Sequence, residues 1–447
     1  MPMNARALPR GKSTHDSRFA CAFAGVVALL AFCCALGLTA QTQESAAITV
    51  VDHGPNAPRQ LAKHYVILIS FDGFRWDYAT RYGATNVLAL EAKGASAPQG
   101  MIPSYPSVTF PNHYTLVTGL YPEHHGIVEN TFYDPARKQV YSYSDASTVT
   151  DGSWYGGTPL WVLAEQQGMR AACFFWPGSE ADIQGVRPSY YAKYDTRFPN
   201  DKRVEQVLAW LRLPPPQRPH FITLYFSITD SAGHRYGPDS PQVADAVHEV
   251  DAALGKLEHG LDALKLPVDL VVVADHGMAE VPPKWINLDE HGLNTSLLEN
   301  YEGALLYATS DDDTQKIFDA MKTGTSEYKV YRRADLPKRL HFSLNPRAGD
   351  PVIVPTGAYA IRVKDDPARP QPSPGEHGFD PSIVPQMKAL FVAQGPDIRA
   401  GITVASFENV NVYPLIARIL GLDIRALKTG PIDGQLSVLQ GILAKPN

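Results

Sequence analysis

Three strand-like apolar runs, far apart in the sequence, each lie just before an aspartate. YVILIS precedes Asp72, FITLYFSIT precedes Asp230, and VDLVVVA precedes Asp275. Apolar runs this continuous are typical of strands buried on both faces of a parallel sheet. Open α/β sheets bind ligands beyond the carboxyl ends of their strands, so we expect the fold to gather these carboxylates in one crevice.

The chain alternates between strand-like and helical patterns, which predicts an α/β fold with a mostly parallel central sheet and helices on both faces. Strand-like runs fall near 65–70, 170–175, 220–228, 268–274 and 389–394, and helical patterns near 77–93, 111–119, 158–168, 202–213, 241–260 and 409–420. We therefore assign residues 64–280 and 389–447 to one catalytic α/β domain.

The segment between these two parts has a different sequence pattern. Short strand candidates surround one helical pattern near 312–322, and motifs are fewer. This predicts an inserted smaller α/β subdomain, residues 281–388, with His377 at its edge where the chain returns to the main sheet.

Residues 1–40 have the features of an export signal, because basic residues precede an apolar stretch over 19–40. That stretch is long enough to span a bilayer, so a cleaved signal peptide and an uncleaved membrane anchor both remain open. Residues 41–63 read as a linker. We expect an exported protein, periplasmic or extracellular. Cys173 is the only cysteine outside the apolar stretch, so no internal disulfide is expected.

The formal net charge of −6 lacks the basic excess of a protein that coats nucleic acid. A small phosphorylated substrate stays possible, because bound metal ions bring their own positive charge. The sequence indicates no protein partner.

Thr109 precedes an apolar-periodic helical pattern, and Pro111 suits the first turn of that helix. The hydroxyl of Thr109 would then lie where free N–H groups and the helix dipole favour an anion. A plain helix cap is the simpler interpretation of this motif alone. The presence of the three strand-terminal aspartates in the same chain favours a catalytic hydroxyl instead.

Two sets of side chains are suited to metal ions. Asp72 and the Asp275–His276 pair suit one metal together with the oxygen of Thr109, since coordination activates a weak hydroxyl. Asp230 and His234 are four residues apart, so a helical turn places them on one side, and with His377 they suit a second metal. Carboxylates mixed with imidazoles and no cysteine fit catalytic Zn²⁺. Any one of these residues, taken singly, is more often a turn or core residue.

The motifs FDGFRWDY, YPSVTFPNHYTLVTGLYPEHHGIVENTFYDP, FFWPGS, DSAGHRYGP and ADHGM resemble the nucleotide pyrophosphatase/phosphodiesterase family of the alkaline phosphatase superfamily. The resemblance runs from about Tyr65 to Ile419. It implies an alkaline-phosphatase-like fold, two Zn²⁺ ions held by the residues just named, and Thr109 as a nucleophile that forms a phospho-threonine. The implied reaction is hydrolysis of nucleotide phosphodiester and pyrophosphate bonds to nucleoside 5′-monophosphates.

The same resemblance implies roles in substrate binding. Asn130 would stabilise the phosphoryl oxygen, with the helix N–H near Phe110 as its companion. Phe110 and Tyr194 would sandwich a nucleobase, and Trp176 would form a wall of the pocket. Thr131 stands where several nucleotide-cleaving relatives carry lysine, which leaves the choice of substrate open.

Other functions remain as alternatives. A choline-type or lysophospholipid phosphodiesterase of the same family would need an acidic and aromatic pocket, which the sequence does not locate. A phosphate monoesterase would need an arginine fork beside Thr109, and none follows it. A binding protein on an enzyme scaffold would be indifferent to loss of Thr109.

Overall fold

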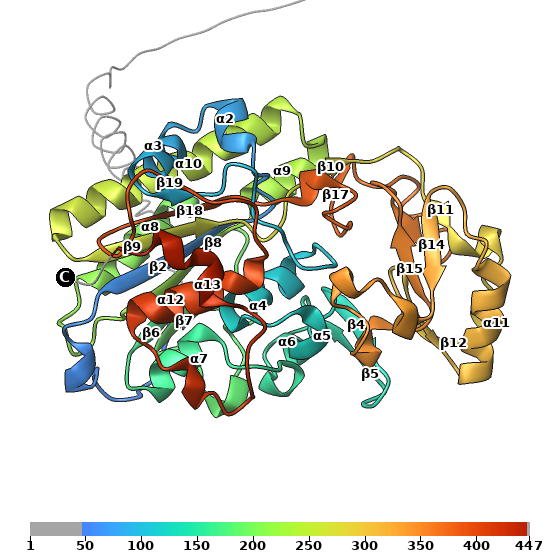
Figure 1. Cartoon of the computed structure of the whole chain (residues 1–447), viewed down its shortest axis with the longest axis horizontal. Helices are drawn as coiled ribbons and strands as arrows, with labels where there is room; N and C mark the ends of the chain where they lie inside the picture. Colours follow the sequence, from blue (N-terminus) through green and yellow to red (C-terminus); the bar gives the residue numbers. More distant parts are fainter. Residues whose placement is uncertain (1–46, 445–447) are drawn as a thin grey trace, which may run out of the picture. The chain divides into compact units, whose positions relative to one another are not determined.

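The centre of the protein is a nine-stranded sheet in the order β1-β7-β6-β8-β2-β9-β18-β3-β19 (Figure 1). The computed structural model describes residues 47–444, so the predicted signal or anchor of residues 1–40 lies outside the described residues. Within 47–444, no helix has both the length and the apolarity needed to cross a bilayer.

The middle of the sheet is built from three neighbouring parallel strands whose residues are all buried. They are β8 (Phe221–Phe226), β2 (Tyr65–Phe71) and β9 (Val268–Val273). Each is one of the continuous apolar runs, as expected for strands covered on both faces. Their carboxyl ends therefore meet at one edge of the sheet.

Shorter strands extend the sheet on both sides. They are β6 (Ala171–Phe174), β7 (Tyr190–Ala192), β1 (Ile48–Val50), β18 (Phe391–Gln394), β3 (Ala95–Ser96) and β19 (Ile402–Thr403). β18 runs antiparallel to β9, and β1 runs antiparallel to β7. The structure thus differs from the linker predicted for 41–63, because residues 48–50 form an edge strand of the main sheet.

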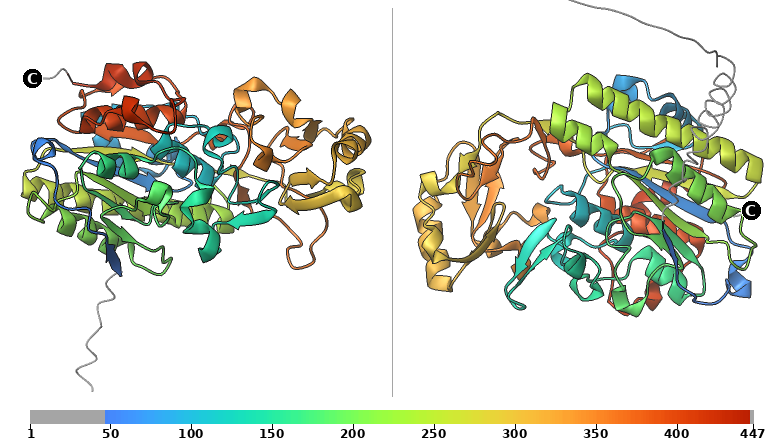
Figure 2. Two further views of the ribbon diagram at one scale, coloured as in Figure 1. Left: turned by 90° about the horizontal axis from the view of Figure 1, so that it is seen from below. Right: turned by 180° about the vertical axis from the view of Figure 1, so that it is seen from behind.

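Helices cover the two faces of the sheet, which confirms the predicted α/β fold with a mostly parallel sheet. In the left view of Figure 2, α12 (Val412–Leu420, red) lies on one side of the sheet, and α8 (Asn200–Leu211) and α10 (Pro241–Leu264) lie on the other. Helix α4 (Thr109–Thr118), which begins at the candidate nucleophile, packs against α12.

A second, four-stranded sheet lies within the predicted insert, in the order β12-β13-β15-β14. Its elements are β12 (Leu298–Glu302), β13 (Leu305–Ala308), α11 (Asp311–Met321), β14 (Tyr328–Tyr331) and β15 (Val352–Pro355). They enclose a separate hydrophobic core that includes Leu306, Ile317 and Tyr328. The outgoing strand β10 (Ala279–Glu280) pairs with the returning strand β17 (Gly375–Glu376), so the segment leaves and rejoins the main body at one place.

Candidate active site

The three strand-terminal aspartates meet at the carboxyl edge of the main sheet. Asp72 follows β2, Asp275 lies two residues after β9, and Asp230 lies in the first turn of α9 (Ile228–Tyr236), directly after β8. Gly73 permits this approach: its φ is +67°, and a Cβ there would lie 2.9 Å from the Cα of Asp230. Its N–H also donates to Asp275 Oδ1 at 3.2 Å. Only glycine fits both the left-handed backbone and the close contact.

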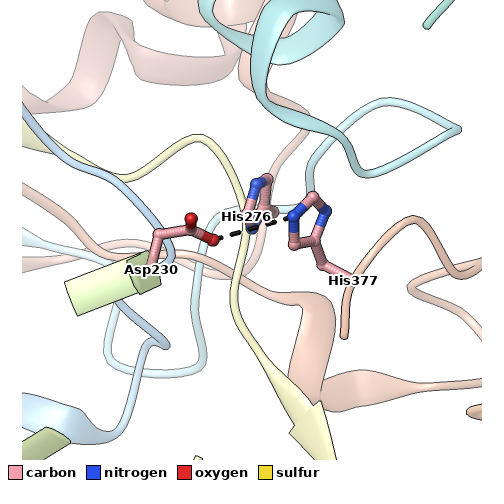
Figure 3. Close-up of side chains that lie close together, drawn as sticks. All are labelled: Asp230, His276 and His377. Carbon is pink, nitrogen blue, oxygen red and sulfur yellow. Dashed lines mark ion pairs between the residues drawn. The ribbon is translucent and has the colours of Figure 1, made fainter. Parts of the chain in front are cut away.

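Three histidines surround these carboxylates. Figure 3 shows Asp230, His276 and His377 converging, with His377 Nε2 3.7 Å from Asp230 Oδ1. The rings of His276 and His377 stack with centroids 3.7 Å apart. His234 Nε2 lies 3.1 Å from His377 Nε2 and 3.4 Å from Asp230 Oδ1. Six of the seven predicted ligands are thus joined by contacts shorter than 4 Å, and Thr109 completes the set below.

Each of these histidines has its Nδ1 committed to a backbone carbonyl. His377 donates to Ser107 O at 3.0 Å, His234 to Gly375 O at 2.9 Å, and His276 to the adjacent Gly277 O at 2.8 Å. A carbonyl can only accept, so Nδ1 carries the proton and the neutral ring has its lone pair on Nε2. Metal-ligating histidines are commonly oriented in this way.

The carboxylates also have the features of metal ligands. Asp72 Oδ1, Asp230 Oδ1 and Asp275 Oδ2 are buried and accept no hydrogen bond among the described residues. Buried carboxylate oxygens without donors are strongly unfavourable unless a cation compensates them. The donor set of carboxylates and imidazole Nε2 atoms therefore fits Zn²⁺.

The pKa directions reflect the same crowding of charge. Burial, together with the charges of Asp275 and Asp230, raises the pKa of Asp72 well above its usual range. Burial also raises the pKa of Asp230. At Asp275 burial acts in the same direction, but His276 and His113 outweigh it and hold the pKa well below normal. Without cations the carboxylates of the cluster thus have strongly shifted pKa values, as expected of a site that is built around cations.

Thr109 is the first residue of α4, and its Oγ1 lies 3.3 Å from His276 Nε2. The residue that caps this helix is Val108, and no side chain caps it. The hydroxyl of Thr109 is therefore not engaged as a helix cap and faces the carboxylate–imidazole cluster, as the catalytic interpretation requires.

Asn130 lies immediately before β4 (Thr131–Asp134), beside the start of α4. Its Oδ1 accepts the backbone N–H of Phe110 at 2.9 Å. The Phe110 N–H, expected to assist the phosphoryl oxygen directly, is thus bonded to Asn130. Among the described residues, the Nδ2 group of Asn130 has no partner, so it remains available as a donor.

The three predicted substrate-binding aromatics differ in exposure. Phe110 is half-buried, with its ring 5.6 Å from that of Tyr143, and Tyr194 is 42% exposed, with its hydroxyl 2.9 Å from Ser227 Oγ. Trp176 is only 1% exposed. Its Nε1 donates to the backbone oxygen of His113 at 3.3 Å. The prediction that Trp176 forms a pocket wall does not agree with this burial, because its ring is buried against His113 of α4.

The sequence analysis missed three supporting groups. His113 of α4 lies 3.4 Å from Asp275 Oδ2. The hydroxyl of Tyr225, in strand β8, donates to Asp72 Oδ2 at 2.5 Å. The carbonyl of Ser107 orients His377. A tyrosine inside a doubly buried strand was the one signal available, because its hydroxyl needs a partner there.

Comparisons with known proteins identify relatives of this chain. Residues 66–380 match the model of the type I phosphodiesterase / nucleotide pyrophosphatase family. The chain is 35% identical over 409 residues to human ectonucleotide pyrophosphatase/phosphodiesterase family member 1, which covers 88% of this chain and 43% of the human protein. It is 37% identical over 395 residues to a venom phosphodiesterase of Naja atra, covering 85% of this chain and 46% of that protein. It thus spans less than half the length of these two relatives.

Among solved structures, the fold is similar to murine ectonucleotide pyrophosphatase/phosphodiesterase 5, an inactive variant in complex with AMP. The TM-score is 0.78 and the sequence identity 28%, over 86% of this chain and 100% of the murine chain.

Proposed function

The chain belongs to the type I phosphodiesterase/nucleotide pyrophosphatase family, and from this premise we propose that it is an exported hydrolase of nucleotide phosphodiester and pyrophosphate bonds. The products are nucleoside 5′-monophosphates. One observation carries the proposal. The Thr109 hydroxyl makes no helix-cap hydrogen bond and lies beside a cluster of carboxylates and of histidines whose Nε2 atoms carry a lone pair.

Two zinc ions complete the proposed site. Asp72, Asp275, His276 and Thr109 would hold one, and Asp230, His234 and His377 the other. The buried carboxylate oxygens without donors and the oriented imidazoles support this assignment. Zinc at such a site makes a hydroxyl nucleophilic at neutral pH and stabilises charge that develops on phosphoryl oxygens.

The residues of the chain then divide the reaction among them. Thr109 Oγ gives up its proton to solvent and attacks phosphorus, and the bond to the leaving oxygen breaks in line, so that this oxygen departs with the bonding electron pair. Water then cleaves the phospho-threonine and releases the monophosphate. Asn130 Nδ2, which its bond to Phe110 N–H holds in place, donates to the phosphoryl oxygen as charge develops.

Phe110 and Tyr194 are assigned to the nucleoside half of the substrate. Both aromatic rings have accessible surface, and stacking on aromatic faces is tolerant of base identity. The murine relative of similar fold was solved in complex with AMP, which supports a nucleoside monophosphate as a ligand of this chain. Export is inferred from the basic residues and the apolar stretch 19–40 of the sequence.

The test compares kcat/KM of the zinc-loaded chain on p-nitrophenyl-TMP, p-nitrophenyl phosphate and p-nitrophenyl phosphorylcholine. We expect a strong preference for the first, with TMP as product. Thr109→Ala should lower kcat at least about 10³-fold, whereas Thr109→Ser, which keeps a hydroxyl, should restore part of it. Preference for the monoester, or full activity in Thr109→Ala, would overturn the proposal.

A further inference from the structure

A cavity of about 450 Å³ separates the histidine cluster from the small sheet. His234, His377 and Asn130 line it on the side of the candidate active site. Trp285 and residues 302–305 line it on the side of the insert. The reacting phosphorus would therefore face the insert across this space.

The cavity offers space for a leaving group on the side of His234 and His377. Thr109 Oγ1 is next to His276, and Thr109 is not among the residues that line the cavity. In-line displacement places the leaving group opposite the attacking oxygen. Phe110 and Tyr194, assigned to the base, also lie outside the cavity lining.

Carboxylates dominate the charge of this cavity. Glu129, Glu302 and Glu376 line it, and its lining includes no lysine or arginine. Glu302 ends β12, at the turn into β13, and has no hydrogen-bond or ion-pair partner for its carboxylate among residues 47–444. Glu129 Oε1 accepts only the neighbouring N–H of Asn130, at 2.9 Å. Beyond the phosphate that the proposed zinc ions would hold, a polyphosphate leaving group would meet these carboxylates.

Arg362 of the insert does not neutralise these carboxylates. The Arg362 guanidinium lies 5.1 Å from the ring of Trp285, on the insert. It is bonded to Asp365 and, at 2.6 Å, to Asn287 Oδ1, and it does not line the cavity. Its charge is thus compensated outside the cavity.

Aromatic rings provide the second feature of the lining. Trp285 and Tyr359 are half-buried, and Tyr105, Phe342 and Phe379 complete the aromatic wall. Aromatic faces attract cations, and a desolvated quaternary ammonium gains about 2 kcal/mol in such a setting. The combination of acidic and aromatic groups is the one expected for a choline-type substrate, and here it lies beyond the phosphorus rather than on the base side.

We propose that this cavity is a leaving-group subsite that selects groups bearing a positive charge on an apolar body, such as a quaternary ammonium, over pyrophosphate. The inference rests on the proposed function. With CDP-choline, Thr109 Oγ would displace phosphocholine from the cytidylyl phosphorus. Water would then release CMP, so that CDP-choline and water give CMP and phosphocholine.

The test uses three substrates that share the cytidylyl half and differ in the leaving group: CDP-choline (cationic end), CDP-glycerol (neutral end) and CTP (pyrophosphate). The zinc-loaded chain is assayed at low salt without added magnesium. We expect kcat/KM to fall in that order. Equal or better cleavage of CTP than of CDP-choline would overturn the subsite. If none of the three substrates is cleaved, the proposed function itself is overturned.

Variants of Glu302 separate charge from shape. Glu302→Gln should lower the ratio of kcat/KM for CDP-choline to that for CTP by about fivefold, mainly through KM. Glu302→Lys should lower the ratio further. Glu299→Gln, an exposed position on the same strand β12, is the matched control and should leave the ratio unchanged. An unchanged ratio in both Glu302 variants would overturn the inference.

Discussion

The backbone N–H of Phe110 donates to Oδ1 of Asn130 over 2.9 Å. Because an N–H can only donate, this bond fixes which amide atom faces the helix. It leaves the Nδ2 group of Asn130 free to donate next to Thr109, the first residue of α4. The start of the helix thus orients the side chain that we assign to the phosphoryl oxygen.

Asn130→Asp removes the Nδ2 donor and adds a negative charge, while a carboxylate oxygen still accepts from Phe110. We expect kcat on p-nitrophenyl-TMP to fall about 10²–10³-fold, as for loss of an oxyanion donor. The melting temperature should change little. Asn294→Asp, an exposed capping residue of the insert, is the control for the chemical change. A loss in kcat below about fivefold would argue against the donor role.

Tyr194 offers a test of the base site that separates its ring from its hydroxyl. Tyr194→Phe loses only the 2.9 Å bond to Ser227 and should keep KM within about twofold. Tyr194→Ala loses a stacking face worth about 1–3 kcal/mol, so KM for p-nitrophenyl-TMP should rise about tenfold. The base-free ester p-nitrophenyl phosphorylcholine should show no such rise. An equal rise for both substrates would place the base elsewhere.

The long strands were predictable because each is a mostly apolar run of six or seven residues. β3 and β19 were not, since strands of two residues carry no periodic signal. β1 was missed for another reason. Its residues 48–50 become a strand only through pairing with β7, which lies far away in the sequence.

The candidate site shows the same division. Asp72 and Asp230 come together because parallel pairing of β2 with β8 brings two strand ends to one edge. The support from Tyr225 depends on the register that sets it beside Ser70, and a sequence pattern does not specify register between distant strands. Trp176 misled the prediction because a large aromatic residue suits a pocket wall and a core equally well, and only burial distinguishes them.

Metal removal should affect both activity and stability. Asp72 Oδ1 is buried without a donor beside two further carboxylates, so the metal-free protein retains uncompensated charge. We expect exhaustive chelation to abolish hydrolysis and lower the melting temperature, and Zn²⁺ to restore both. At a hundredfold excess over Kd the stabilisation is about 2.7 kcal/mol. Asp72→Asn, with a neutral amide, should lose less stability on chelation than the unmodified chain. Activity that survives chelation would exclude the metal assignment.

A second buried carboxylate, Asp269, lies far from the candidate site, near the amino end of β9. Its Oδ1 accepts the N–H of Asp397 at 2.9 Å, its Oδ2 has no partner among the described residues, and its side chain is fully buried. Burial, with the charge of Asp397 adding to it, raises the pKa of Asp269 to about 8. In the unfolded chain an aspartate has a pKa of about 3.9.

This shift predicts how stability depends on pH. Between about pH 4 and pH 8 the folded protein retains a proton at Asp269 that the unfolded chain has lost, so the free energy of unfolding should fall as pH rises through this window. The slope from this one group is at most about 1.4 kcal/mol per pH unit. Asp269→Asn keeps an acceptor for Asp397 N–H and has no proton to lose, so its free energy of unfolding should fall less steeply, and at pH 8 it should exceed that of the unmodified chain. Urea unfolding at pH 5, 6, 7 and 8 measures both slopes, with the exposed Asp262→Asn at the end of α10 as the control. Parallel profiles for Asp269→Asn and the unmodified chain would show that Asp269 is already ionised in the folded state.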